Sequence, residues 1–159
     1  MLDSEDAVIA EKTGEGAFQV RIQTAEHDFL MDEPTSFGGL STGPSPFETL
    51  CAALGACTVM TMQLYAARKG WTLDGLKVRV THRKGSPEAR DSFEREIQLR
   101  NVTDEQRERL LSIAQRCPVH LLLDRGAGVS TTIGEENLAE PECGGLHEQV
   151  IDELCSNAA

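Results

Sequence analysis

The sequence predicts an α+β fold with the element order β-β-β-α-β-β-α-β. Short runs of β-branched or alternating apolar residues, bounded by turn residues, occur before residue 32 and again between residues 76 and 100. Between these groups, residues 46–69 form one long apolar segment that ends at Gly70, as a helix would. We assign residues 1–134 to this fold. Residues 135–159 form an acidic C-terminal extension that could contain a short helix.

The first three strands are expected at 7–12, 17–23 and 27–31, with a Gly-containing turn that favours a hairpin between the first two. Residues 32–46 are dense in Gly, Pro, Ser and Thr, which predicts a loop. The sheet therefore leads through a loop into the long helix.

A capping box defines the start of the 46–69 helix, with Ser45 as N-cap, Pro46 at the first helical position and Glu48 at the third. The helix is apolar nearly all the way round, so it should be the central buried element. One small subunit has too little structure to cover that surface, and large apolar patches are uncommon on soluble monomers. We therefore expect a homodimer.

The second half of the chain repeats the strand-then-helix pattern. Strands are expected at 76–83 and 93–100, and a capping box of Thr103 with Gln106 opens a helix at 104–116. A last strand is expected at 128–134. The extension carries an amphipathic pattern at Leu146, Val150, Ile151 and Leu154.

Charge and targeting signals narrow the function classes. The net charge of −11, from 15 basic and 26 acidic residues, disfavours nucleic-acid and anionic-membrane partners, which both need basic patches. The N-terminal MLDSEDAVIAEK lacks the order of a signal peptide and no membrane span is expected, so the expected location is cytoplasmic. Five cysteines in a reducing compartment favour metal, catalytic or core roles over a disulfide framework.

Two cysteines attract attention by their positions. Cys57 lies mid-helix, and Cys51 points about 240° away from it, so these two cannot pair. From spacing alone a packing role is favoured for Cys57, because buried cysteine behaves as a small hydrophobe. Cys117 precedes Pro118, which should end one helix and start a new turn, placing the thiol at a helix N-terminus where its pKa falls. Closing the apolar stripe of the 104–116 helix is an equally good explanation of Cys117.

The stretch DEPTSFGGLSTGPSPFETLCAALGACTVMTMQLYAARKGW, followed later by RCPVH, resembles the OsmC/Ohr family of thiol-dependent hydroperoxide reductases. More narrowly, it resembles the OsmC-like branch that is sometimes fused to an α/β-hydrolase domain. The motifs are the G-P-S-P-x-E loop, the A-L-G-A-C-T run and the C-P-V turn, in that order. The resemblance covers roughly residues 7–134.

The resemblance implies an enzyme of peroxiredoxin-type activity in which Cys57 attacks an organic hydroperoxide as thiolate and becomes a sulfenic acid. Cys117 would then form a disulfide with it, and an external dithiol of lipoyl type would reduce that disulfide. The resemblance also implies an intertwined homodimer with its active sites at the subunit interface. No cofactor and no metal are implied.

The sequence departs from the family pattern at the activating cation. Family members hold an arginine from the N-terminal hairpin against the thiolate, whereas this turn reads EKTGEG, with Lys12 before it and Arg21 in the next strand. Without a cation, burial raises the pKa of Cys57. Glu48 is one residue out of register with the family glutamate, and its capping role already explains it. The alternative is therefore a non-catalytic OsmC-like dimer that binds a small ligand or is associated with the stress response.

The remaining candidates carry weak signals. His27 and His82 lie on expected strands and are best interpreted as satisfied surface or core histidines. The spacing of Cys143, His147 and Cys155 matches no structural zinc pattern.

Overall fold

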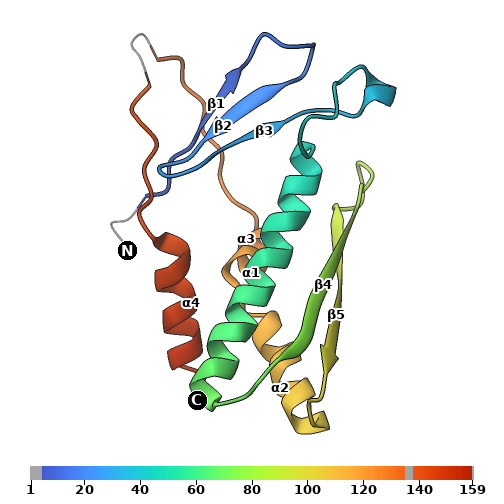
Figure 1. Ribbon diagram of the computed structural model, residues 1–159, viewed down its shortest axis with the longest axis vertical. Helices are drawn as coiled ribbons and strands as arrows, with labels where there is room; N and C mark the ends of the chain where they lie inside the picture. The colour runs from blue at the N-terminus through green and yellow to red at the C-terminus, as the bar shows by residue number, and fades with distance from the viewer. Residues whose placement is uncertain (1–4, 135–137, 159) are drawn as a thin grey trace. The chain divides into compact units, whose positions relative to one another are not determined.

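The computed structural model describes residues 5–134 and 138–158 (Figure 1), and the chain divides into two units. The first unit is Met1–Thr49 with Gly128–Leu146, and the second is Leu50–Ala127 with His147–Ala159. The described residues form helices and two small sheets, as the α+β prediction requires. The expected division between residues 134 and 135 stays a prediction.

The first unit contains a three-stranded antiparallel sheet in the order β1-β2-β3. Its strands are β1 (Ile9–Lys12), β2 (Val20–Gln23) and β3 (Asp28–Met31). Ile9 faces Gln23, and Val20 faces Met31 on the other side. The three expected strands are confirmed, each starting one to three residues later than the pattern indicated.

A single buried carboxylate organises the loop after β3. Asp32 is only 3% exposed, and it accepts hydrogen bonds from the backbone N–H of Leu40 at 3.0 Å and the hydroxyl of Thr42 at 2.8 Å. Burial raises the pKa of Asp32, but these hydrogen bonds and one from Glu33 outweigh it, so the pKa lies below its usual range. The loop, which includes a 3₁₀ turn at Thr35–Phe37, is thus held in place by hydrogen bonds to the Asp32 carboxylate.

Helix α1 (Pro46–Lys69) has the predicted bounds and the predicted cap. The Ser45 backbone N–H donates to Glu48 Oε2 at 2.8 Å, and the Glu48 N–H donates to Ser45 Oγ at 3.4 Å. The hydrogen bonds that the Ser45 N–H and the Ser45 hydroxyl donate to the Glu48 carboxylate lower the pKa of Glu48. By length and composition α1 could cross a membrane, a test that core helices of soluble proteins also pass. Its buried residues belong to the core of the second unit.

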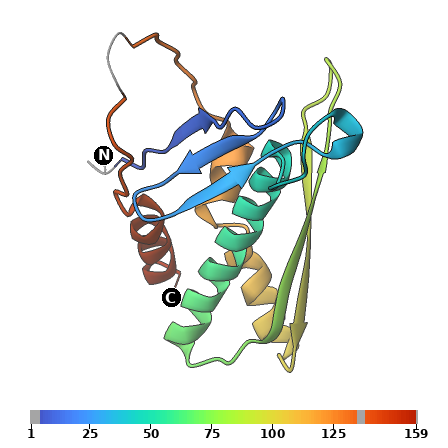
Figure 2. The same cartoon turned by 45° about the horizontal axis from the view of Figure 1, so that its top comes forward.

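The second unit packs α1 against a hairpin and further helices. Strands β4 (Asp74–Arg83) and β5 (Ser92–Arg100) form a long antiparallel ribbon beside α1 (Figure 2), with Val80 opposite Arg95. Helix α2 (Asp104–Ala114) begins with the predicted Thr103–Gln106 capping box. Helices α3 (Pro118–Arg125) and α4 (Leu146–Ser156) follow, and α4 confirms the short C-terminal helix.

The main hydrophobic core of this unit lies between α1, β5, α2 and the C-terminal segment. Its buried members are Met62, Tyr65, Leu99, Leu110, Ile113, Ala114, Cys155 and Ala158. The guanidinium of Arg68 on α1 also binds Asp152 on α4. The end of the chain therefore contributes directly to the core.

The predicted strand at 128–134 is wrong. Within the described residues this segment pairs with no strand, and Val129 and Ile133 are 90% and 95% exposed. The segment is rich in β-branched residues, which favour a pleated surface, but a strand also needs a neighbouring edge to bind its backbone groups. The expected helix 104–116 is also shorter, because it ends at Ala114 before the proline.

Candidate active site

The two cysteines that the motifs singled out lie together in the second unit. Cys57 of α1 and Cys117 at the start of α3 form a small buried cluster with Leu54, and both thiols are free. Cys57 is 2% exposed and Cys117 is fully buried. Their thiols hydrogen-bond to each other. The apolar side chains packed around them are Val80, Phe93, Val119 and Leu123.

The start of α3 turns backbone N–H groups toward this pair. Cys117 is the N-cap residue in extended conformation, and Pro118 occupies the first turn, as the Cys-Pro sequence predicts. The N–H of Val119 donates to the Cys57 sulfur at 3.4 Å. The N–H of His120 lowers the pKa of the Cys117 thiol, although the Cys117 side chain forms no cap hydrogen bond. Both sulfurs therefore lie near the positive end of a helix.

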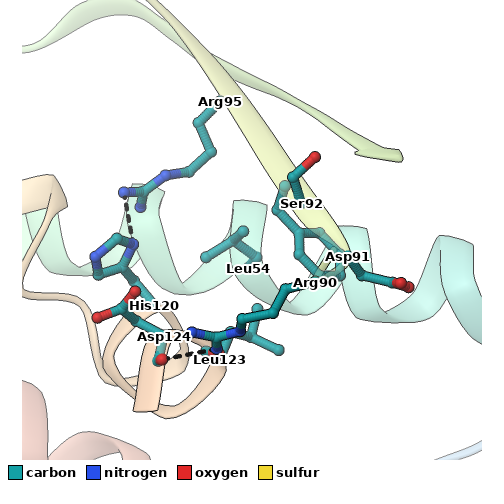
Figure 3. A pocket seen from close by; sticks show the side chains of 9 residues that line it. Leu54, Arg90, Asp91, Ser92, Arg95, His120, Leu123 and Asp124 are labelled. Atoms are coloured by element: carbon teal, nitrogen blue, oxygen red, sulfur yellow. Dashed lines mark hydrogen bonds between the residues drawn. The ribbon is translucent and has the colours of Figure 1, made fainter. Parts of the chain in front are cut away.

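The cation beside the pair is Arg95 of β5, which the sequence patterns did not single out. Its Nη1 lies 3.7 Å from the Cys117 sulfur and donates to Thr58 Oγ1 at 2.8 Å and to the Ala114 carbonyl at 2.9 Å. Its Nη2 bonds the Nδ1 of His120 at 3.1 Å (Figure 3). Because arginine only donates, this ring nitrogen is the acceptor and the ring carries a proton on Nε2. Arg95 thus joins α1, α2 and α3.

A sequence signal for Arg95 did exist. Along β5 every second side chain is turned inward, and Arg95 shares that inward face with Phe93, Ile97 and Leu99. A lone charge at an inward position predicts a buried partner. In contrast, Arg79 and Arg83 of β4 form exposed ion pairs with glutamates of β5.

The surroundings of the two thiols shift their pKa values in opposite directions. The hydrogen bond from the Cys57 thiol lowers the pKa of Cys117 to about 5, aided by the His120 N–H, the Thr58 hydroxyl and Arg95, while burial opposes the shift. The same bond to Cys117, together with burial, raises the pKa of Cys57. The Thr58 hydroxyl has one proton, which it donates to the Leu54 carbonyl at 2.7 Å, whereas the Cys117 sulfur is 3.7 Å away. We therefore rank the effect of Thr58 on the pKa of Cys117 below that of Arg95. Both shifts favour the proton on Cys57 and the negative charge on Cys117.

An open pocket of about 540 Å³ lies beside the cluster (Figure 3). Its apolar walls come from Leu54, Phe93 and Leu123, and Arg95 and His120 lie on its surface together with Arg90, Asp91, Ser92 and Asp124. Arg90 is held at the end of α3 by the Asp124 carbonyl, 2.9 Å from Nη2. The pocket combines apolar walls with the cation that contacts Cys117.

The other predicted residues lie elsewhere. Glu48 serves the capping box, and Lys12 and Arg21 belong to the first unit, so their reach toward Cys57 stays a prediction. His82 pairs with Asp91, with 2.7 Å between Nε2 and Oδ2.

The C-terminal candidates do not assemble into a site. Cys155 is buried in the main core and Cys143 is exposed. Over the part of the chain that the structure describes, no group of three His, Cys, Asp or Glu side chains could hold a metal ion.

Comparison with known proteins supports the resemblance noted in the motifs. The family model described as OsmC-like protein matches residues 38–132, which include both cysteines and Arg95. The chain belongs to the OsmC-like family. No protein of curated function matches it in sequence.

Solved structures share the fold of this OsmC-like protein. An osmotic stress induced and detoxification response protein from Psychrobacter arcticus 273-4 superposes with a TM-score of 0.64 at 17% identity, covering 75% of this chain and 88% of the other. An OsmC-like protein from Mycoplasma pneumoniae gives 0.60 at 22% identity, covering 77% and 89%. The organic hydroperoxide resistance protein OhrB of Bacillus subtilis gives 0.53 at 17% identity, covering 74% and 88%. At these identities the likeness establishes the fold.

Proposed function

We propose that this OsmC-like protein reduces organic hydroperoxides through the Cys57–Cys117 pair. The observation that carries the proposal is a buried pair of hydrogen-bonded thiols with a guanidinium 3.7 Å from one sulfur. Peroxide attack needs a thiolate, and recovery of a sulfenic acid needs a second thiol nearby. Several structural neighbours are named for organic hydroperoxide resistance, which agrees with this chemistry.

The cycle balances with the groups present and one external dithiol. A thiolate attacks the terminal oxygen of ROOH, so that an S–O bond forms, the O–O bond breaks, and the alkoxide leaves and takes up a proton as the alcohol. The sulfenic acid condenses with the other thiol, forming the disulfide and releasing water. A dithiol reductant, of lipoyl type by resemblance, then reduces the disulfide and becomes oxidised itself. The resemblance assigns the attack to Cys57, and either order yields the same disulfide.

The walls of the pocket favour organic hydroperoxides over hydrogen peroxide. Leu54, Phe93 and Leu123 supply apolar surface beside the thiols. An organic peroxide can bury its hydrocarbon part there, at about 25 cal/mol per Å² of apolar surface. Hydrogen peroxide has no such part and gains nothing from these side chains.

Peroxidase activity is tested by following consumption of cumene hydroperoxide and hydrogen peroxide with dihydrolipoamide as reductant. We expect faster turnover of cumene hydroperoxide, and loss of multiple turnover in both Cys57→Ser and Cys117→Ser. Cys143→Ser is the matched control, since Cys143 is an exposed free cysteine outside this cluster. If wild type and Cys57→Ser consume peroxide equally slowly, the non-catalytic, ligand-binding function replaces this one.

We also propose that the protein is a homodimer. On α1, Leu50 and Met60 are 42% and 50% exposed, which is unusual for large apolar side chains of a central helix. On another face of α1, a groove between this helix and β4 is lined by small and apolar residues: Cys51, Ala52, Gly55, Ala56, Val59, Val78 and Val80. A second copy of the chain would cover this surface, which otherwise exposes apolar area to water.

Sedimentation at micromolar concentration should give about twice the 17.3 kDa chain mass. Ala56→Arg should shift the protein toward monomer, because a charge in an apolar interface is costly to bury. Leu111→Arg is the control, placing the same charge at an exposed apolar position of α2. A 17.3 kDa species in the wild type would contradict the dimer.

A further inference from the structure

We infer that Arg95 is a positioning residue for the resolving step, in which it holds the Cys117 sulfur ready to attack a sulfenic acid on Cys57. The inference rests on the proposed function, because it assigns a role within the same dithiol cycle and keeps Cys57 as the sulfur that attacks the peroxide. Three features of the site carry it: the partners of the guanidinium, the separate contacts of the two sulfurs, and the bonds that fix Arg95 in place.

The first feature is a half-buried guanidinium without a carboxylate partner. Arg95 donates to a hydroxyl, a carbonyl and a ring nitrogen, and among the described residues it forms no ion pair with Asp or Glu. A charge held partly away from water is costly unless an opposite charge lies nearby. Of the described groups that Arg95 contacts, the one that can become an anion is the Cys117 sulfur, 3.7 Å from Nη1. The guanidinium is therefore placed to stabilise a thiolate on Cys117.

The second feature is that the two sulfurs have separate contacts. The Cys117 sulfur lies 3.7 Å from Arg95 Nη1 and 3.7 Å from Thr58 Oγ1. The Cys57 sulfur instead accepts the N–H of Val119 at 3.4 Å, and the two thiols bond each other. A change at Arg95 should therefore act on Cys117 directly and on Cys57 only through the bond between the thiols.

The third feature is the set of bonds that fixes the guanidinium. Nη1 of Arg95 donates to Thr58 on α1 and to the carbonyl of Ala114, the last residue of α2. Nη2 bonds His120 on α3 (Figure 3). Cys117 lies between α2 and α3, so the same three elements hold both the cation and this sulfur. A nucleophile held next to its target loses little entropy on reaction.

The resolving step balances with the two cysteines and one proton. After peroxide reduction Cys57 is a sulfenic acid, whose sulfur is electrophilic. The Cys117 thiolate attacks that sulfur with its electron pair, so that the S–S bond forms and the S–O bond breaks. The departing hydroxide takes up a proton from solvent and leaves as water. The rate depends on the thiolate fraction of Cys117, which the guanidinium increases.

Single-turnover kinetics separate the first oxidation from its resolution. Reduced wild type and Arg95→Met are mixed in quenched flow with one equivalent of cumene hydroperoxide at pH 7, without a reductant. Residual peroxide reports the first step, and the mass of the acid-quenched protein reports the disulfide. We expect Arg95→Met to consume peroxide within about twofold of the wild-type rate, but to form the disulfide up to about tenfold more slowly, because a pKa raised by about 3 units leaves about a tenth of Cys117 as thiolate.

The lifetime of the sulfenic acid gives a second readout. In Arg95→Met, Cys57 should collect more dimedone adduct than in the wild type, and more sulfinic acid when peroxide is in excess. Both effects report a slow second step and not a loss of the first one.

The pH profile distinguishes this role from a purely structural one. The ionisable groups at the Cys117 sulfur are Cys57 of α1 and Arg95 of β5, with His120 of α3 bonded to Arg95. In Arg95→Met the delay in disulfide formation should fade toward pH 9, where Cys117 ionises without the guanidinium. A packing defect would persist at that pH.

Two further variants complete the comparison. Arg95→Lys keeps the charge and should lie between the wild type and Arg95→Met, and it keeps the test available if the methionine variant does not fold. Arg83→Met is the matched control, because its guanidinium is exposed and pairs with Glu94, and it should match the wild type in both steps.

Three outcomes would overturn the inference. The first is slower peroxide consumption in Arg95→Met with unchanged disulfide formation, because the guanidinium would then serve the attack by Cys57. The second is disulfide formation at the wild-type rate in that variant, and the third is a delay that does not depend on pH. All three leave the proposed peroxidase function intact. If the wild type neither consumes peroxide nor forms the disulfide, that function and the inference both fail.

Discussion

Arg95→Met is expected to raise the pH at which Cys117 becomes reactive by about 1–3 units, the shift that an opposite charge within a few ångströms produces. In the wild type the pKa of Cys117 is about 5, so its thiolate persists from neutral pH down to that value and is lost below it. Without the guanidinium, burial still raises the pKa and the opposing charge is gone. Alkylation of Cys117 at pH 7 should slow by up to about tenfold, because a pKa raised by 3 units would leave only about a tenth of this cysteine as thiolate.

The measurement is the pH profile of iodoacetamide alkylation. Arg95→Lys keeps the charge but has fewer donors for Thr58, Ala114 and His120, so it should give an intermediate midpoint. Arg83→Met is the matched control on the same hairpin, since its guanidinium is exposed and pairs with Glu94. An unchanged alkylation midpoint in Arg95→Met, with the fold intact by circular dichroism, would falsify the role of Arg95.

Leu110→Ala is expected to cost about 2–5 kcal/mol of unfolding free energy, the range for removing a buried leucine side chain. Leu110 is fully buried in the core that joins α1, β5 and α2. For a chain of this size the melting temperature should fall by several degrees, at about 2–4 °C per kcal/mol. Protein concentration must be held constant, because dimerisation would contribute to the apparent stability.

The neighbouring Leu111→Ala is the control for this effect. It removes the same atoms from the same helix, but Leu111 is 45% exposed, so its cost should be within about 0.5 kcal/mol. The difference between the two variants measures the burial of one face of α2. Equal costs would show that α2 packs on a different face from the one in the structure.

Local signals placed the starts of α1 and α2 accurately because the interactions that define these starts are local. The capping boxes at Ser45 and Thr103 each join residues three positions apart, and Pro118 restricts only its immediate neighbours. The strand expected at 128–134 depended instead on a distant partner. Its β-branched residues could not indicate whether such a partner exists, and within the described residues none pairs with it.

The motifs pointed to the two cysteines, whereas Arg95 was not predicted. A motif comparison finds what the chain shares with its family, and the hairpin arginine of that family is missing here. Arg95 lies 37 positions from Thr58 and 22 from Cys117, so no window of sequence contains this cluster. Its inward position on β5 was readable from the alternation of the strand. Its contacts with Thr58 and Cys117 could not be read from the sequence.

The sequence by itself determined the starts of α1 and α2, the α+β class and the pair Cys57 and Cys117 as the place to look for chemistry. Only the tertiary structure decided which of these sulfurs lies beside the cation. The physical reason is that acidity depends on groups a few ångströms away, and Coulomb interactions fall with distance in space rather than along the chain. Folding brings β5 and the start of α3 together at one sulfur, and that contact makes the two thiols unequal.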